Sequence, residues 1–398
     1  MGQELSFTGN APHFASGAVR ALPASAVASG PVLQLYARDW RDFTRSDRIA
    51  RWDALARFAT EPNPFYESWS LLPALKAFDP KGGVKLLTLE ADGQLAGLMP
   101  VQRLGRYYRH VLPHLRNWTH DNCFLGAPLI AKGFERLFWE HVFGWADACA
   151  GGALFLHIAH VPATGPIRVS LAATLAGQER IAATVYCEER AALVSRAGPE
   201  CYLRESLSAK KRKELRRQQR RLEDEGELTF HRQDDDIGLD SWCRDFLQLE
   251  ARGWKGDAGS ALACKAATAR LFTRSLEGAA RRGRLERLAY RLDGKPIAML
   301  ANFLCPPGAF SFKTAFDEAY AKYSPGVLLQ VENLELLRRD GVQWADSCAA
   351  QGHPMIAHFW RERRAIARHS IAIGGPLRRR AFAAIVAREI GRAPGGIV

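Results

Sequence analysis

The fold is decided by two similar stretches, Val84-Lys-Leu-Leu-Thr-Leu-Glu-Ala-Asp-Gly-Gln-Leu-Ala-Gly-Leu-Met and Leu285-Glu-Arg-Leu-Ala-Tyr-Arg-Leu-Asp-Gly-Lys-Pro-Ile-Ala-Met-Leu-Ala. Each stretch consists of two apolar runs joined by an Asp-Gly pair, at Asp92-Gly93 and at Asp293-Gly294. Such a pair predicts a type I′ hairpin, because both turn residues must adopt positive φ angles. The sequence therefore predicts two β-hairpins of the same design.

Each predicted hairpin follows a helix-like stretch, residues 69–78 in the first half and residues 266–281 in the second. The two copies lie about 200 residues apart in a chain of 398 residues, which indicates a tandem duplication and two α/β domains. The expected divisions are a flexible tail at 1–30, an N-terminal domain at 31–200, a C-terminal domain at 201–375, and a basic helix or tail at 376–398.

The composition, 47% apolar and 24% charged residues, is that of a folded globular protein. No apolar run reaches the ~18 residues of a membrane-spanning helix, and the first residues lack the pattern of a signal peptide. The eight cysteines occur singly, without zinc-site spacing. We expect a cytoplasmic protein, free or peripheral to the membrane, with no transmembrane segment, no metal and no tightly bound cofactor.

The net charge of +13 is concentrated in two segments. Residues 204–221 hold nine Lys or Arg against two Glu, residues 361–398 hold nine Arg against two Glu, and the rest of the chain is nearly neutral. The first segment lies in a predicted helix at 206–225 with cations around most of its circumference. Lys210 to Arg221 is therefore either a docking site for a polyanion, such as tRNA or anionic lipid, or a solvated helix face.

The second half continues from its hairpin into a strand, a helix and a further strand. Alternating side chains predict the first strand at 309–316. Ser324 fits an N-cap and Pro325 the first helical position, so a helix begins there and ends near Arg339, before a strand at 341–348. A helix start reached through a glycine-containing turn presents unpaired N–H groups and a positive dipole end, which predicts a phosphate site.

Five further blocks of sequence are distinctive when taken together and in this order: Asn63-Pro-Phe-Tyr-Glu-Ser-Trp, Asn117-Trp-Thr-His-Asp-Asn-Cys-Phe-Leu-Gly-Ala-Pro-Leu, Leu249-Glu-Ala-Arg-Gly-Trp-Lys-Gly, Phe316-Asp-Glu-Ala-Tyr-Ala-Lys-Tyr-Ser-Pro-Gly, and Asp346-Ser-Cys with His353-Pro-Met. These blocks resemble the GNAT-type N-acyltransferases, in the branch that includes CelD-like cellulose-biosynthesis-associated proteins and is related to the FemAB aminoacyltransferases. The resemblance covers roughly residues 31–370. It implies tandem GNAT-like domains, each a mixed, mostly antiparallel sheet flanked by helices, and acyl transfer from acetyl-CoA or a longer acyl-CoA to an amine.

Four residues at these strand ends are candidates for catalysis. Asp317 or Asp346 can remove a proton from the incoming ammonium group, a role that needs a carboxylate within hydrogen-bond reach. Lys313 can contact the thioester carbonyl or a phosphate. Tyr320, with Tyr323, can donate to the oxyanion or to the leaving thiolate. The alternatives are a turn-capping aspartate, a solvated lysine and aromatic rings that only pack.

The remaining candidates bind the two substrates. Gly326 lets a phosphate approach the backbone closely, since it has no side chain. The residues expected to hold CoA are Tyr323, Ser324, Pro325, Gly326 and Val327. The residues expected to contact the acceptor are Trp254, Lys255 and His353, for which the alternatives are a core anchor and a surface histidine.

The sequence thus predicts an N-acyltransferase with its thioester between residues 309–316 and 341–346. One alternative is a Fem-like transferase that takes its acyl group from an aminoacyl-tRNA, whose phosphates the basic helix would bind. Another alternative is a binding protein whose GNAT fold has lost its chemistry and docks through that helix. Sugar amines, peptide amines, polyamines and lipid precursors all remain possible acceptors.

Overall fold

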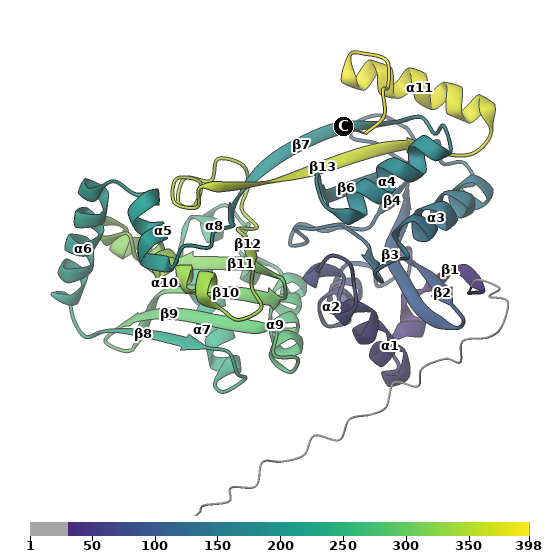
Figure 1. The fold of residues 1–398 in the computed structure, drawn as a ribbon. Helices are drawn as coiled ribbons and strands as arrows, with labels where there is room; N and C mark the ends of the chain where they lie inside the picture. Colours follow the sequence, from purple (N-terminus) through teal and green to yellow (C-terminus); the bar gives the residue numbers. More distant parts are fainter. Residues whose placement is uncertain (1–30, 398) are drawn as a thin grey trace, which may run out of the picture.

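The computed structural model describes residues 31–397, which form one mixed sheet of 13 strands with helices packed on it (Figure 1). The strand order is β1-β2-β3-β4-β6-β13-β7-β12-β11-β10-β9-β8, and β5 pairs with β3. The predicted tail at 1–30 lies outside the described residues. No helix within the described part of the chain is long and apolar enough to cross a membrane.

The strands in the described range are β1 (Leu33–Asp39), β2 (Lys85–Ala91), β3 (Gln94–Leu104), β4 (His114–Asn117), β5 (Leu129–Ile130), β6 (Phe155–Pro162), β7 (Ala182–Leu193), β8 (Leu228–Gln233), β9 (Leu285–Leu292), β10 (Lys295–Cys305), β11 (Gly308–Phe316), β12 (Trp344–Asp346) and β13 (Glu362–Ala372). The α-helices are α1 (Ser46–Arg57), α2 (Ser68–Phe78), α3 (Glu135–Cys149), α4 (Pro166–Gly177), α5 (Pro199–Ser206), α6 (Ala209–Glu223), α7 (Leu239–Arg252), α8 (Trp254–Asp257), α9 (Ala266–Ala280), α10 (Pro325–Glu332) and α11 (Pro376–Ile390).

Both predicted hairpins are present, as β2-β3 and β9-β10. The turn residues Asp92 and Gly93 have φ angles of 46° and 74°, and Asp293 and Gly294 have φ angles of 48° and 76°. Positive φ at both positions is the signature of a type I′ turn, which matches the twist of the flanking strands. The type I′ turns predicted from the sequence are therefore confirmed in both halves.

The strands after each hairpin repeat the same arrangement. In the first half β4 lies beside β3 and pairs in parallel with β6, after the crossover helix α3. In the second half β11 lies beside β10 and pairs in parallel with β12, after the crossover helix α10. All other pairs between the labelled strands of residues 31–397 are antiparallel. The tandem repeat of a mixed, mostly antiparallel α/β unit is therefore confirmed.

The last strand of each half pairs with the other half. β13, the last strand of the second half, lies between β6 and β7, and β7, the last strand of the first half, also pairs with β12. Figure 1 shows β7 and β13 as two long neighbouring strands that run from one half to the other. The sheet therefore continues across the boundary that the sequence places near residue 200.

The halves also meet through helices. Gly278 of α9 lies against α2, because a Cβ atom at this position would be only 2.7 Å from Cβ of Trp69. The Trp69 ring packs on Phe303 of β10, and Arg282 forms an ion pair with Asp53 at 2.7 Å. These contacts make the two halves share one buried apolar core.

Three elements of the second half differ from the sequence predictions. Lys313 pairs with Ala301 and Ser311 pairs with Asn302, so a bulge at Phe312 interrupts the alternation expected along 309–316. The helix predicted to reach Arg339 is α-helical only to Glu332 and continues as a 3₁₀ segment. The strand predicted at 341–348 is reduced to β12. The basic helix α6 and the C-terminal helix α11 form where the sequence places them.

Candidate functional site

The strands β11 and β12 separate after a short pairing. β12 pairs with Gly308 to Phe310 of β11, and β11 then runs on to Phe316 beside β10 alone. The chain after β12 turns at Cys348, which has a φ angle of 52°. Beyond Phe310, β11 therefore has no strand neighbour on its β12 side. This is the separation in which the sequence predicts the thioester.

Lys313 lies on the separated part of β11 and is half-buried. Its Nζ atom is 5.2 Å from the ring centroid of Phe124 and 5.8 Å from that of Phe312. Burial, followed by the charge of Lys255, lowers the pKa of Lys313 to about 8. An ammonium group held by aromatic faces, with no ion pair to a carboxylate within residues 31–397, keeps its hydrogen-bond donors for a ligand.

Lys255 and Trp254 of α8 lie close to the end of β11. Lys255 Nζ is 2.9 Å from Glu250 Oε1 and donates to the carbonyl oxygen of Thr314 at 3.3 Å. The Trp254 ring is 57% exposed, and its backbone N–H donates to Glu318. The structure therefore places Lys255 and Trp254 beside the strand that carries Lys313.

His353 belongs to the same neighbourhood. Burial and the positive charge of Lys255 both lower its pKa. Its Nδ1 atom accepts a hydrogen bond from the backbone N–H of Met355 at 3.4 Å. Lys255, Trp254 and His353 therefore lie near the segment of β11 that carries Lys313.

Asp346 is fully buried, and both of its oxygen atoms are engaged. Oδ1 accepts from the backbone N–H of Cys348 at 2.8 Å, and Oδ2 accepts from Arg364 at 3.0 Å. Oδ2 also lies 3.7 Å from Arg190 Nη1. Because this carboxylate compensates two largely buried guanidinium groups, its contacts favour a structural role over proton transfer.

The other candidates between the two strands have mainly local contacts. Asp317 is half-buried and its Oδ1 accepts from the backbone N–H of Ala319 at 2.9 Å, which is the turn-capping arrangement. Tyr323 is buried and donates to Glu225, while Tyr320 packs against the apolar cluster beneath α6 and α10. Asp317 Oδ2 has no partner among the described residues, so it is the freer of the two candidate carboxylates.

The start of α10 is packed more closely than the sequence predicts. Ser324 is left-handed, with φ of 54°, and its side chain does not cap the helix. The N–H of Ser324 bonds to Ala321 and that of Val327 bonds to Ser324. A Cβ atom on Gly326 would lie 2.9 Å from Met355 Sδ and 3.1 Å from Phe316. The glycine is therefore required by side-chain packing, and the backbone of this turn offers fewer free donors than expected.

The loop that faces Lys313 from the first half holds two residues that were not predicted as site residues. Phe124 contributes its ring, and His120 lies close enough for the charge of Lys313, after burial, to bring its pKa to about 3. The available signal was the block beginning at Asn117, in which Trp118, His120 and Phe124 lie close together.

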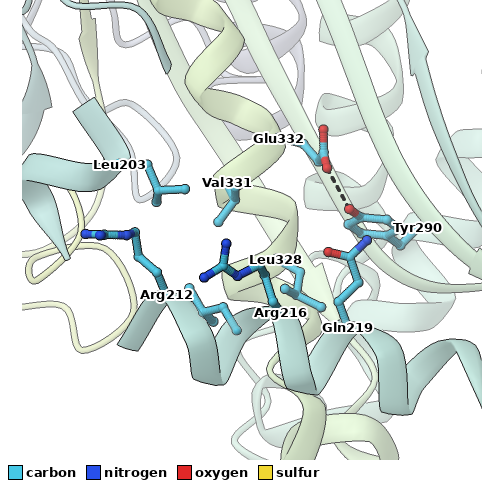
Figure 2. Close-up of a pocket in the computed structure, with 9 residues that line it drawn as sticks. Leu203, Arg212, Arg216, Gln219, Tyr290, Leu328, Val331 and Glu332 are labelled. Atoms are coloured by element: carbon cyan, nitrogen blue, oxygen red, sulfur yellow. Dashed lines mark hydrogen bonds between the residues drawn. The ribbon is translucent and has the colours of Figure 1, made fainter. Parts of the chain in front are cut away.

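A small groove of about 110 Å³ lies between α6 and α10 (Figure 2). Apolar side chains of both helices line it, together with Arg212 and Arg216, and Tyr290 closes one side by donating to Glu332 at 2.8 Å. Arg212 bonds to the carbonyl oxygen of Arg204 at 2.8 Å. Arg212 therefore anchors α6 to α5.

The other cations of α6 lie at the surface, Arg216 at the rim of the groove. Arg217 forms an ion pair with Glu214 at 2.7 Å. The remaining ones are exposed and make no ion pair within residues 31–397: Lys210, Lys211, Lys213, Arg216, Arg220 and Arg221. This surface keeps its positive charge uncompensated.

Residues 209–353 match the family model described as "Acetyltransferase (GNAT) domain". No curated protein sequence matches the chain. Among solved structures, FemX is similar over 85% of this chain and 98% of its own, with 9% identity and a TM-score of 0.53. A conserved protein of unknown function from Bacteroides thetaiotaomicron VPI-5482 is similar over 82% and 97%, with 11% identity and a TM-score of 0.54.

At these identities the structural likeness shows the fold. The match to the GNAT domain model is confined to residues 209–353, and the chain as a whole has a fold similar to that of FemX. The predicted GNAT-like fold is therefore confirmed.

Proposed function

We propose that this protein is an N-acyltransferase that moves an acyl group, acetyl in the first instance, from acyl-CoA to an amine at the separation of β11 and β12. The observation that carries the proposal is Lys313, a cation held against two aromatic rings at this point of a GNAT domain.

The proposed reaction begins when the neutral amine attacks the thioester carbonyl. A C–N bond forms, and the negative charge that develops on the carbonyl oxygen is stabilised by the Lys313 ammonium group. Collapse of the intermediate breaks the C–S bond. The amine gives its proton to a base, for which Asp317 is the candidate, and the departing thiolate takes up a proton, for which Tyr320 is the candidate donor. Trp254, Lys255 and His353 would contact the acceptor.

The donor is tested by thermal unfolding of the full chain with acetyl-CoA, with free CoA and with bulk tRNA. A ligand that binds only the native state stabilises it by ~2.7 kcal/mol at about one hundred times its dissociation constant, so acetyl-CoA should raise the melting temperature. We expect CoA alone to have a smaller effect of the same sign. No shift with any CoA species, at concentrations up to millimolar, would contradict the proposed donor.

A second candidate donor, an aminoacyl-tRNA, is favoured by the uncompensated cations of α6 and by the closely packed start of α10. A polyanion releases condensed counterions when Lys and Arg neutralise its phosphates, so its binding depends steeply on salt. One CoA carries too few phosphates to engage a helix of about 20 Å. Salt-dependent binding of tRNA to α6 would therefore distinguish an aminoacyl-tRNA donor from an acyl-CoA donor.

Changing Arg216, Arg217, Arg220 and Arg221 to Gln should weaken tRNA binding and flatten its salt dependence, by ~0.7 in the log-log slope for each lost contact to single-stranded phosphate. Filter binding across a salt series measures both quantities, with anionic liposomes as a parallel polyanion. The matched control changes four exposed cations elsewhere, Arg45, Arg57, Lys132 and Arg136, to Gln. Equal losses in the two variants, or no binding of either polyanion at low salt, would leave α6 as a solvated face.

A further inference from the structure

The parallel pair of the first half, β4 and β6, ends in a cluster of basic side chains. The register of β13 shifts at Arg368 on both sides, because β6 has one extra residue opposite Arg368 and β7 has one extra residue between the partners of Arg368 and His369. On the β6 side of this shift lies His160, whose φ angle of 56° is rare for a residue other than glycine. Arg368 Nη2 donates to His160 Nε2 at 3.4 Å. Bulges and backbone strain of this kind redirect side chains at functional sites.

Four nitrogen atoms of this cluster are buried without a hydrogen-bond partner in the described part of the chain. They are Arg116 Nε, His160 Nδ1, Arg190 Nη1 and Arg368 Nε. Because His160 Nε2 accepts from Arg368, the imidazole hydrogen is on Nδ1, so all four atoms are N–H donors. Burial, then the charge of Arg368, lowers the pKa of His160 to about 3, which keeps the ring neutral. Burying an N–H donor without an acceptor costs free energy, and these four donors have no acceptor within the described part of the chain.

The cluster also carries excess positive charge. Arg116 and Arg368 make no ion pair with a carboxylate of residues 31–397, and burial with the charge of Arg368 lowers the pKa of Arg116. Arg190, with a side chain only 4% exposed, lies 3.6 Å from Glu188 and 3.7 Å from Asp346. Since Asp346 is also bonded to Arg364, these two carboxylates do not neutralise the cluster.

We propose that Arg116, His160, Arg190 and Arg368 form a binding site for the phosphoryl group of a small molecule. Guanidinium and imidazole donors that come from different strands suit the three oxygen atoms of a phosphoryl group, whose charge is near −2 at neutral pH. A carboxylate has two oxygen atoms and a single charge, so it satisfies fewer of these donors. The site corresponds, in the repeated fold, to the place of Lys313 in the second half.

Two exposed tyrosines lie beside Arg368, at the outer side of the cluster. Arg368 Nη1 donates to the hydroxyl of Tyr108 at 3.4 Å, and its Cζ atom lies 4.6 Å from the ring centroid of Tyr186. On the inner side, Arg190 donates to the carbonyl oxygen of Phe124 at 2.6 Å, and the Phe124 ring faces Lys313. The phosphoryl site is thus adjacent to the candidate acyl-transfer site but does not depend on acyl transfer.

The test is equilibrium dialysis of the full chain against radiolabelled inorganic phosphate at constant ionic strength. The wild-type protein should bind about one phosphate per chain with saturation at millimolar concentration or below. Arg368→Gln should bind it at least about tenfold more weakly, because a charged donor pair is lost. Arg136→Gln, which removes an exposed arginine of α3, should bind phosphate like the wild type.

Competition identifies the group that is bound. Phenyl phosphate should displace the labelled phosphate, and acetate at the same concentration should not. If Arg368→Gln does not fold, as judged by circular dichroism, Arg116→Gln replaces it with the same expected loss. Absence of saturable binding, unchanged binding in the folded variant, or displacement by acetate as effective as by phenyl phosphate would each overturn the proposal. No acyl donor is present in this assay, so its outcome is separate from that of the proposed reaction.

Discussion

Replacing Lys313 by Met should lower the rate of acyl transfer about 10²- to 10³-fold, because a preorganised donor aimed at the developing oxyanion supplies about that much acceleration. The folded protein should be at least as stable as the wild type, since the substitution removes a half-buried charge that no carboxylate compensates. Single-turnover rates with acetyl-CoA and an amine panel measure the first effect. Lys295→Met, at an exposed position on β10, is the matched control and should leave the rate unchanged.

The pH dependence of the rate distinguishes two roles for this lysine. With its pKa at about 8, Lys313 loses its proton as the pH rises through that value, so a cation that stabilises an oxyanion gives a rate that falls above pH 8. A rate that instead rises through pH 8 and is lost in Lys313→Met would assign Lys313 as the base and contradict the oxyanion role.

The lowered pKa of Lys313 also makes the stability of the folded protein depend on pH. The folded pKa lies below the usual value of 10.5. The unfolded chain therefore binds more protons between about pH 8 and pH 10.5, and the contribution of Lys313 to stability increases with pH in that window. Lys313→Met should lack this increase, which urea unfolding at several pH values measures.

Asp346→Ala should destabilise the protein by about 3–5 kcal/mol, the cost of removing one partner of a buried ion pair. The reason is that Arg364 and Arg190, with side chains only 16% and 4% exposed, would lose the carboxylate that lies beside them. Urea denaturation followed by tryptophan fluorescence measures the change in the free energy of unfolding.

The control for Asp346 is Asp317→Ala, which removes a single capping hydrogen bond and should cost about 1 kcal/mol. If Asp346→Ala is as stable as Asp317→Ala, the buried ion pairs do not hold β12 in place. A fully folded but inactive Asp346→Asn variant would indicate that Asp346 is the catalytic base. A folded but inactive Asp317→Asn variant would support Asp317 as the base.

The features that the sequence predicted correctly depend on local chemistry. Asp293-Gly294 fixes its turn because the two residues tolerate positive φ angles, whatever surrounds them. Pro325 marks the start of α10 for the same reason, since its fixed φ angle suits the first helical turn. The position of Lys313 within a strand also followed from the alternating side chains of residues 309–316.

The features that the sequence did not predict depend on distant contacts. Gly326 was expected to make room for a phosphate, but the room is occupied by Met355 and Phe316, which no local pattern indicates. The pairing of Asp346 with Arg190 and Arg364 requires β7 and β13, two strands that come from different halves of the chain. The bulge at Phe312 arises from the register of β10 with β11, which sequence alternation alone does not fix.

The place of β13 between β6 and β7 has a consequence for synthesis of the chain. While the first half emerges from the ribosome, β6 has an unpaired edge, and its partner is completed only when residue 372 has been made. An unpaired strand edge invites association with other chains. During synthesis of the residues between β6 and β13, this edge of β6 therefore has no partner strand. A truncated chain that ends before β13 would keep that edge permanently open.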